Sequence, residues 1–377
     1  MSERAHDVVL YGATSFVGAL TAEHLSRHAP PGTRVALAGR SLERLQQARS
    51  GLPDVARDWP LVVADATDER ALAGLAASTR AVASTVGPYA RHGLPLVEAC
   101  AAAGTHYADL TGEVQFVRAA IDRCDAPARA SGARLVHACG YDSVPSDLAV
   151  LLLAEQAGAD GAGGLTDVTT RVRLRGGVSG GTIASIRSEV EAVRTDRAAA
   201  RLARDPFGLS PNRDAEPDVP QPPDVAPPAP VGGRWTAPFV MASYNTRIVR
   251  RSNALSGWRY GRGLRYREVL DVGRGPVGAL TAAGVSAGLG ALVGAMLLPP
   301  GRALLDRVLP GAGQGPSQQT RDAGWFRHET LAVTESGRRY LATVSAQGDP
   351  GYAATAVMLG EALLALGLDE RRPAPAP

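Results

Sequence analysis

The sequence predicts an α/β protein with an N-terminal doubly wound parallel sheet and a second α+β domain on a mixed or antiparallel sheet. Two observations carry this prediction. Short apolar runs alternate with helical patterns over roughly the first 150 residues, which is the spacing of βαβ units. After Thr166 apolar and polar residues alternate with a period of two, as in antiparallel strands with one solvated face.

The domain boundaries follow from these changes of pattern. We expect the parallel sheet in residues 1–148, a domain for substrate binding or dimerisation in 149–347, and an amphipathic helix with a disordered tail in 348–377. Residues 205–233 are rich in proline and lack apolar periodicity, which predicts a long surface excursion or a flap rather than a core element. Strands are expected to resume around Phe239 to Ser243.

The first strand-to-helix turn has the pattern of a phosphate site. The apolar run that begins at Val8 breaks at Gly12 and resumes as a helical pattern from Phe16. Gly12 permits the tight turn, and Gly18 lets the helix pack closely on the strand. Ser15 occupies the place of the usual middle glycine, and its side chain can point away or bond a phosphate oxygen. The predicted pyrophosphate-binding residues of this Rossmann-type turn are Gly12, Ala13, Thr14, Ser15, Phe16, Val17 and Gly18.

The ends of the next strands indicate which dinucleotide binds. Arg40 and Ser41 follow the second strand about 20 residues past the turn, where an acid would hold the ribose of NAD and an arginine accommodates the 2′-phosphate of NADP. The sequence therefore predicts NADP(H). Asp65 ends the third strand and is a candidate for the adenine side. Val86, Gly87 and Pro88 follow the fourth strand and should flank the pyrophosphate or nicotinamide.

Composition excludes several kinds of chemistry. The formal net charge is only +3, without a basic stripe that would indicate nucleic-acid binding. All 40 basic residues are arginine, so Schiff-base chemistry and the Tyr-x-x-x-Lys pair of short-chain dehydrogenases are excluded. The seven histidines and three cysteines lack metal-ligand spacing, and we expect no catalytic metal. The cysteine usage and the polar N-terminus predict a cytoplasmic protein.

A second turn carries reactive groups. The sixth predicted strand runs into Cys139-Gly140-Tyr141-Asp142-Ser143-Val144-Pro145-Ser146-Asp147. This turn brings hydroxyl, carboxyl and phenol groups to a strand end, where they can act in catalysis. The alternative is a capped connection into the second domain.

Residues 275–301 contain no charged residue before Arg302 and are long enough to span a bilayer. Three interpretations are open: a helix that is buried or faces a dimer partner, peripheral contact with a membrane, and a true membrane span. Arginines at 259, 262, 265 and 267 precede the segment, and such a basic flank favours contact with anionic lipids.

Seven motifs together resemble the saccharopine dehydrogenase-like oxidoreductases, and more closely their actinobacterial branch of trans-acting enoyl reductases. They are Gly12–Gly18, Thr85–Tyr89, Asp109–Glu113, Gly140–Asp147, Gly177–Thr182, Gly315–Ser317 and Gly348–Tyr352. The resemblance implies a Rossmann domain, a second α+β domain and a returning C-terminal helix. It further implies an NADPH-dependent reductase acting on a polyketide-derived enoyl chain in lipid synthesis, with the acyl substrate carried by a polyketide synthase.

In such a reaction hydride reaches the β-carbon, the carbonyl oxygen is stabilised and the α-carbon takes a proton. The candidate proton donors are Tyr141, Tyr89 and water. The enolate could be stabilised by Ser143 or by backbone N–H groups of residues 177–182.

Two other functions are open at this point. A saccharopine-type imine or amino-acid dehydrogenase would need a cationic pocket, for which Arg171, Arg173 and Arg187 are candidates. A protein that binds the cofactor without catalysis could instead act at a lipid surface or as a partner of a synthase. A homodimer and a location at the inner face of the cell membrane are further expectations.

Overall fold

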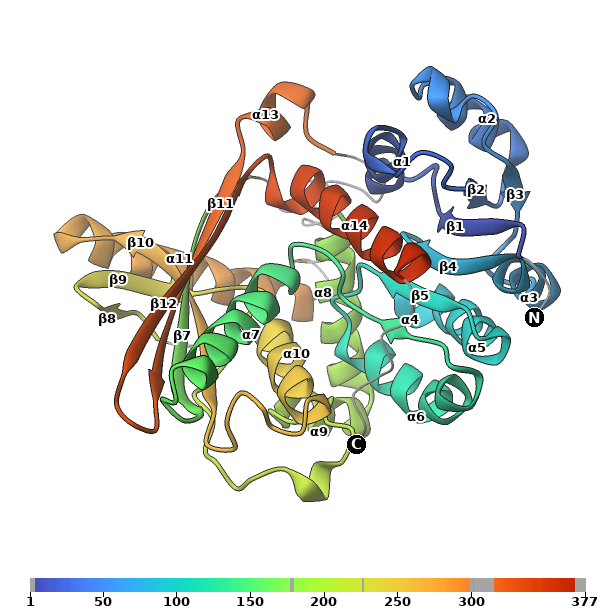
Figure 1. Cartoon of the computed structure of the whole chain (residues 1–377). Helices are drawn as coiled ribbons and strands as arrows, with labels where there is room; N and C mark the ends of the chain where they lie inside the picture. The colour runs from blue at the N-terminus through green and yellow to red at the C-terminus, as the bar shows by residue number, and fades with distance from the viewer. Residues whose placement is uncertain (1–3, 177–179, 226, 299–300, 302–314, 370–377) are drawn as a thin grey trace.

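The computed structural model describes residues 4–176, 180–225, 227–298, 301 and 315–369. Two six-stranded sheets form the framework. Figure 1 shows the first sheet and its helices on one side of the molecule and the second sheet on the other, with helix α14 (Thr355–Leu368) between them.

The first sheet is parallel throughout. Its strands follow the order β3-β2-β1-β4-β5-β6, the doubly wound arrangement that the sequence predicts. The strand order reverses between β1 and β4, so the crevice for a ligand lies beyond the carboxyl ends of these two strands. The strand bounds are β1 His6–Tyr11, β2 Val35–Gly39, β3 Leu61–Val63, β4 Thr79–Ser84, β5 His106–Asp109 and β6 Leu135–Val136.

Helices cover both faces of this sheet because alternate residues of the buried strands point to opposite faces. On one face, the fully buried Leu359 and Leu363 of α14 pack against Val8 and Leu10 of β1, together with helices α1 (Phe16–His28) and α2 (Leu42–Ser50). The predicted return of the C-terminal helix to the first domain is thus confirmed. The other face holds α3 (Glu69–Ser78), α4 (Tyr89–His92), α5 (Leu94–Ala103) and α6 (Val114–Ser131).

The second sheet is mixed, as predicted. Its order is β12-β11-β7-β10-β9-β8, in which β7 and β10 pair in parallel and the other neighbours are antiparallel. Helices α7 (Val144–Ala159) and α10 (Ala242–Leu255) cover one face. The strands are β7 Leu165–Arg175, β8 Ala229–Val231, β9 Arg234–Pro238, β10 Arg265–Gly273, β11 Trp325–Thr334 and β12 Arg339–Gln347.

Two local expectations are wrong. The strand placed at Phe239 to Ser243 ends at Pro238, since β9 is followed by a turn that opens α10. Arg265 and Arg267 do not flank the apolar segment as a basic patch; both lie on β10, where Arg267 donates a hydrogen bond to Thr169 and Arg265 lies 3.6 Å from Asp167. The alternation of arginines with Tyr266 and Glu268 is the pattern of a strand with one buried face.

The proline-rich excursion is anchored, not a free flap. Leu209 is fully buried and belongs to the core of the first sheet's helices. Arg247, Arg250 and Arg251 of α10 donate hydrogen bonds to backbone carbonyls of the excursion or of the residues just before it. Buried guanidinium groups supply donors that proline-rich backbone lacks, and they fix the segment to the second domain.

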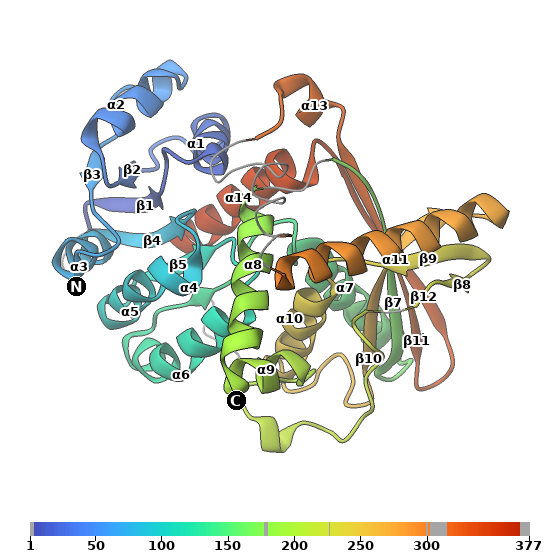
Figure 2. The ribbon, with the colours of Figure 1, turned by 180° about the vertical axis from the view of Figure 1, so that it is seen from behind.

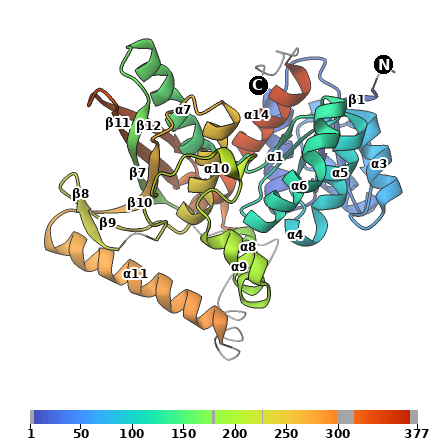
Figure 3. The ribbon, with the colours of Figure 1, turned by 90° about the horizontal axis from the view of Figure 1, so that it is seen from below.

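The apolar segment forms helix α11 (Gly275–Leu297), and most of it is exposed. Only 11% of its most apolar window is buried, whereas the same test gives 56% for Pro350–Leu368, which includes the core helix α14. Figure 3 shows α11 along one edge of the molecule, beside β8 and β9. Burial of this helix in the chain's own core is therefore ruled out, while a partner or a membrane can still cover it.

Candidate active site

The first turn has the close-packed backbone that a dinucleotide requires. Gly12 adopts φ +87°, and a Cβ at this position would collide with the side chains of Thr85 and Val86. The Thr85 hydroxyl donates a hydrogen bond to the Gly12 carbonyl at 2.9 Å, which ties the end of β4 to the turn. A Cβ at Gly18 would collide with the Gly12 carbonyl. Both glycines are thus sterically required, and the residues present fit a pyrophosphate at the start of α1.

Ser15 has a structural task in this turn. Its Oγ accepts a hydrogen bond from the Gly18 N–H at 3.0 Å and so caps α1, and it lies 2.9 Å from the Thr85 hydroxyl. Phe16 and Val17 begin the helix, where N–H groups have no partner within the helix and are available to an anion. Ala13 is fully buried beneath the turn, and Thr14 is exposed at its rim.

The residues predicted for the adenosine half lie at the edge of the same crevice. Arg40 is exposed directly after β2, and Ser41 caps α2 by accepting a hydrogen bond from the Arg44 N–H. The Asp65 carboxylate is engaged within its own turn: one of its oxygens accepts hydrogen bonds from both the N–H and the hydroxyl of Thr67. These hydrogen bonds, with a smaller contribution from Arg40, lower the pKa of Asp65.

A buried carboxylate holds the loop that follows β4. Glu113 is fully buried and accepts hydrogen bonds from the N–H groups of Tyr89 at 3.1 Å and Ala90 at 2.8 Å. The Ser185 hydroxyl of helix α8 (Gly180–Thr195) donates to the same carboxylate at 3.1 Å. Glu113 thus fixes the predicted cofactor residues Val86, Gly87 and Pro88 and connects them to the second domain.

A cavity of about 1130 Å³ opens from this loop. Ser15, Thr85, Gly87 and Pro88 line its cofactor end. The remaining wall is mostly apolar and comes from α8, α10, α11 and the proline-rich excursion; it includes Ile186, Val190, Val225, Phe239, Met241, Leu289, Leu292 and Val293. Figure 2 shows α8 beside the first domain and α11 approaching its upper part, which agrees with a cavity between the two domains.

The three predicted catalytic hydroxyls are engaged elsewhere. The Tyr141 hydroxyl lies 3.1 Å from His328 Nε2 in a buried aromatic cluster, and the Ser143 hydroxyl donates to Asn245 at 3.1 Å. Neither residue is part of the cavity wall. Tyr89 is in the wall, but its hydroxyl donates to the Ser84 carbonyl at 2.9 Å and accepts from the Leu110 N–H at 3.2 Å. Their catalytic roles stay predictions without support from the cavity's geometry.

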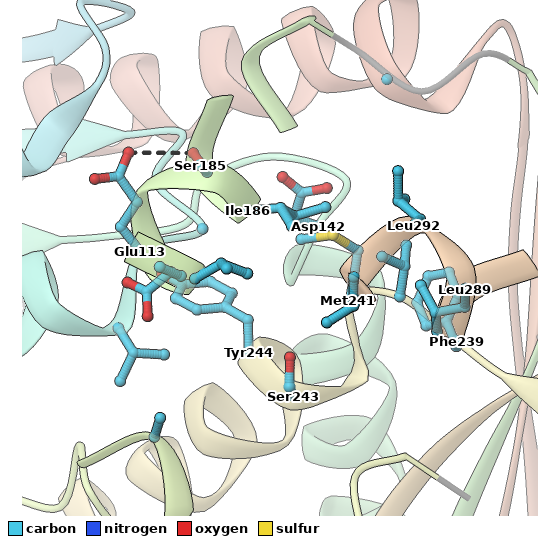
Figure 4. Close-up of a pocket in the computed structure, with 18 of the residues that line it drawn as sticks. Glu113, Asp142, Ser185, Ile186, Phe239, Met241, Ser243, Tyr244, Leu289 and Leu292 are labelled. Carbon is cyan, nitrogen blue, oxygen red and sulfur yellow. Dashed lines mark hydrogen bonds between the residues drawn. The ribbon is translucent and has the colours of Figure 1, made fainter. Parts of the chain in front are cut away.

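Other residues supply the polar part of the wall. Asp142, Glu189, Ser185 and Tyr244 all line the cavity. Figure 4 shows Asp142 near the centre of the labelled side chains, with Ser185 and Glu113 on one side and Leu289 and Leu292 on the other. Sequence reasoning included Asp142 in the predicted turn but assigned the chemistry to its neighbours. Glu189 and Tyr244 lie on helices of the second domain, and no local motif marks them.

The three arginines predicted for the cationic pocket of an imine dehydrogenase do not meet in the cavity. Arg171 is paired with Glu329 at 2.7 Å, and the Arg173 guanidinium lies 5.8 Å from the Trp325 ring centroid. Neither of them nor Arg187 lines the cavity. Of the predicted N–H donors in residues 177–182, those of residues 177–179 lie outside the described part of the chain.

A dinucleotide turn at the edge of a doubly wound sheet, opening into an apolar cavity, defines a nicotinamide-dependent oxidoreductase. Residues 8–136 match the family model described as the saccharopine dehydrogenase NADP binding domain. The cofactor is therefore NADP, as the position of Arg40 predicts.

Relatives that match over nearly the whole chain identify the branch of the family. A Mycobacterium tuberculosis protein named as a trans-acting enoyl reductase is 50% identical over 378 residues, covering 97% of this chain and 90% of that protein. The trans-acting enoyl reductase of Mycobacterium ulcerans is 46% identical over 388 residues, covering 98% and 91%. The chain belongs to the trans-acting enoyl reductase family of the saccharopine dehydrogenase-like oxidoreductases.

Two solved structures are more distant. Saccharopine dehydrogenase (L-Glu forming) from Saccharomyces cerevisiae aligns with 12% identity and a TM-score of 0.48, covering 95% of this chain and 89% of that one. An amine dehydrogenase from Mycobacterium smegmatis aligns with 12% identity and a TM-score of 0.47, covering 96% and 92%.

Proposed function

We propose that this protein reduces the α,β-double bond of a polyketide-derived or fatty acyl thioester with NADPH, in lipid biosynthesis. The observation that carries the proposal is the cavity, which joins the cofactor loops to a long apolar wall. Burial of an extended acyl chain against such a wall favours binding by about 25 cal/mol per Å² of apolar surface removed from water. The names of the mycobacterial relatives support the same reaction.

We assign the following roles to the residues of this chain. The start of α1 holds the pyrophosphate, and Arg40 holds the 2′-phosphate. NADPH supplies a hydride when bound. Glu113 sets the position of the loop at Gly87 and Pro88 beside the nicotinamide end. The apolar side chains of α8 and α11 exclude water and orient the acyl chain.

Oxidation of NADPH by a substrate series tests this function. Enoyl thioesters from crotonyl to hexadecenoyl should be reduced, with kcat/KM rising with chain length as more apolar surface is buried. Pairs of a keto acid and an amine should not oxidise NADPH. Turnover of those pairs without turnover of any enoyl thioester would favour the saccharopine-type alternative, because the same cofactor would then serve imine reduction.

We further propose that the acyl chain is presented by a separate synthase, as the description trans-acting for the relatives suggests. Purified protein should then reduce an enoyl chain attached to an acyl carrier domain with a lower KM than the same chain on coenzyme A. Equal KM values for the two carriers would indicate that only the acyl chain is recognised.

The exposed helix supports a proposal about location. We propose that the protein is cytoplasmic and touches the inner face of the cell membrane through α11. Val277 and Leu280 are each 75% exposed, and no residue between 275 and 298 is charged. The same helix continues into the cavity wall with Leu289, Leu292 and Val293. A lipid surface would cover the exposed part and place the cavity near apolar substrates.

Flotation with phosphatidylglycerol vesicles tests this location. Wild-type protein should float, and the double variant Val277→Glu with Leu280→Glu should not. Leu341→Glu is the matched control, because Leu341 is 58% exposed but lies on β12. A stable homodimer in the absence of lipid that the α11 variant dissociates would show that a second copy covers the helix instead.

A further inference from the structure

Asp142 differs from the other acids around the cavity because none of the described residues holds its carboxylate by a hydrogen bond or an ion pair. It directly follows Tyr141, at the turn between β6 and α7, and it lines the cavity. In the part of the chain that the structure describes, no hydrogen-bond donor or cation contacts its side chain. By contrast, Glu113 accepts three hydrogen bonds, and Glu189 accepts one from the Gln115 N–H at 3.3 Å.

The surroundings of this carboxyl group are mainly apolar. Figure 4 shows it among Ile186, Met241 and Leu292, between the cofactor side of the cavity and the side that α11 lines. An apolar environment without donors disfavours the charged form of a carboxyl group. Burial accordingly raises the pKa of Asp142 to about 6. A carboxyl group of this kind can hold a proton and release it to a strong base.

The phenols near the cavity are less suited to the same task. The Tyr89 hydroxyl is engaged by Ser84 and Leu110, and the Tyr352 hydroxyl accepts a hydrogen bond from the Gly180 N–H. The Tyr244 hydroxyl also lines the cavity and has no hydrogen-bond partner in the described part of the chain, but burial raises the pKa of this phenol well above its usual value, so it releases a proton less readily than a carboxyl group. Among the described residues, Asp142 is therefore the carboxyl group that faces the cavity without a hydrogen-bond partner, and it is a stronger acid than the unpartnered phenol of Tyr244.

We propose that Asp142 is the proton donor of the reduction. The inference rests on the proposed function, because it needs an enoyl thioester in the cavity. Hydride adds to the β-carbon, and the π electrons of the double bond move onto the thioester carbonyl to give an enolate. The enolate then forms a bond from its α-carbon to the Asp142 proton, and the O–H electrons stay on the carboxylate. Solvent returns one proton to Asp142 after each turnover, so one NADPH and one proton are consumed.

The sign of the pH dependence follows from this role. The protonated carboxyl group is the active form, so kcat should fall as the pH rises through the pKa of Asp142 in the substrate complex. The other titratable groups that face the cavity are Glu113, Glu189, Tyr89, Tyr244 and Tyr352, and its cations are Arg194 and Arg247. Burial also raises the pKa of Glu189, to about 7, which makes Glu189 the rival donor.

Three variants separate the possibilities. Asp142→Asn removes the proton but keeps the shape of the side chain. Glu189→Gln does the same at the rival position. Asp147→Asn is the matched control: burial raises the pKa of Asp147 to about 6 as well, but its carboxylate accepts a hydrogen bond from Ser252 at 2.9 Å and does not line the cavity.

Each variant is assayed in D₂O with an α-unbranched enoyl thioester, and the configuration of the deuterated α-carbon is determined. Wild-type protein should place deuterium on one face. Asp142→Asn should lower kcat by about 100- to 10,000-fold and abolish the fall in kcat at high pH. Its product should be a mixture of the two configurations at the deuterated α-carbon, because water replaces a fixed donor. Asp142→Glu should restore part of the rate and a single configuration at the deuterated α-carbon. Titration by NADPH fluorescence should show unchanged cofactor affinity.

The outcomes distinguish the two proposals. If wild-type protein binds NADPH but reduces no enoyl thioester, the proposed function fails and this inference fails with it. If wild-type protein is active and Asp142→Asn keeps the rate, the pH profile and one labelled face, only the assignment of Asp142 is overturned. Loss of facial selectivity in Glu189→Gln or Asp147→Asn, but not in Asp142→Asn, would overturn it as well.

Discussion

The Tyr141 hydroxyl and His328 Nε2 lie 3.1 Å apart within a cluster that also holds Phe326. His328 is fully buried, and burial lowers the pKa of its imidazole to about 3. The imidazole is therefore neutral at physiological pH, and its Nδ1 has no hydrogen-bond partner in the described part of the chain. The pair joins β11 to the turn at residue 141, and we expect it to contribute to stability.

Tyr141→Phe should consequently lower the free energy of unfolding by about 1–3 kcal/mol, since it leaves a buried imidazole nitrogen unpaired. The effect on kcat should be less than about twofold. Such a change corresponds to well under the 1.4 kcal/mol of a tenfold change. Urea unfolding and NADPH oxidation measure the two quantities. Tyr340→Phe is the control, because the Tyr340 hydroxyl donates to Asp160 at the surface and its loss should cost less than about 1 kcal/mol. A large loss of kcat in Tyr141→Phe would restore Tyr141 as the proton donor.

Arg40 should determine the preference for the phosphorylated dinucleotide. Arg40→Ala removes a charged hydrogen-bond donor, a loss of about 1.5–3 kcal/mol. We expect the Kd for NADPH to rise about 10- to 100-fold and the Kd for NADH to change little. Fluorescence titration measures both constants. Arg44→Ala, on the exposed surface of α2, is the control and should leave both unchanged. Equal losses for the two dinucleotides would place the 2′-phosphate elsewhere.

Glu113 should link cofactor affinity to stability. The N–H groups of Tyr89 and Ala90 bond different oxygens of Glu113, so Glu113→Gln leaves an acceptor for only one of them and turns an NH₂ group toward the other. We expect the free energy of unfolding to fall by about 2–3 kcal/mol. NADPH should also bind more weakly, because the loop at Gly87 and Pro88 loses part of its anchor. Ser185→Ala removes one of the three donors and should cost only about 1 kcal/mol. Unchanged NADPH binding in Glu113→Gln would separate this carboxylate from the cofactor site.

The parts of the fold that the sequence could predict are those with local signals. The turn at Gly12, the end of β4 and the parallel strands are short apolar runs bounded by glycine or proline, and each lies where it is expected. The position of α14 against β1 was predictable only through the family resemblance, because its partners are more than 300 residues away. Composition also predicted the long apolar helix α11, but it is apolar around its whole circumference, so periodicity could not tell which side is covered.

The candidate site was predictable to the level of the turn, but not of the residue. Tyr141, Asp142 and Ser143 are consecutive, and the direction of each side chain depends on how the turn packs between the two domains. The structure directs Tyr141 toward His328 and Ser143 toward Asn245, and only Asp142 faces the cavity. The anchoring of the surface excursion at 205–233 could not be predicted for a related reason, since the arginines that hold it come from α10.

Arg247 should hold the proline-rich excursion in place. It is buried, pairs with Asp224 at 2.8 Å and donates to the carbonyl of Asp205 at 3.1 Å. Arg247→Met leaves Asp224 without this partner, which should cost about 3–5 kcal/mol. Limited proteolysis should then cut between residues 205 and 225 faster than in wild type. Arg213→Ala breaks a partly exposed pair with Asp205 and a contact of the guanidinium with the Phe207 ring, and it should cost only about 1 kcal/mol. Resistance of Arg247→Met to proteolysis would contradict the anchoring role.

Glu268 should make the protein less stable as the pH rises. It is fully enclosed beneath α10, where it accepts hydrogen bonds from Tyr266 at 2.7 Å and Asn245 at 2.9 Å. Burial raises the pKa of Glu268 to about 7, against an ordinary value of 4.5. The folded state therefore binds more protons than the unfolded state between these two values, and the free energy of unfolding falls as the pH rises through that window.

The variant Glu268→Gln removes the titrating proton while keeping the size of the side chain. At about 1.4 kcal/mol per pKa unit, the contribution of this one group is at most about 3.5 kcal/mol. Urea unfolding at about pH 5 and about pH 8 should show a smaller loss of stability in the variant than in wild type. A residual loss should remain, because burial also raises the pKa values of Glu189, Asp142 and Asp147. Identical pH dependence in the two proteins would mean that Glu268 keeps the same protonation state in the folded and unfolded chains.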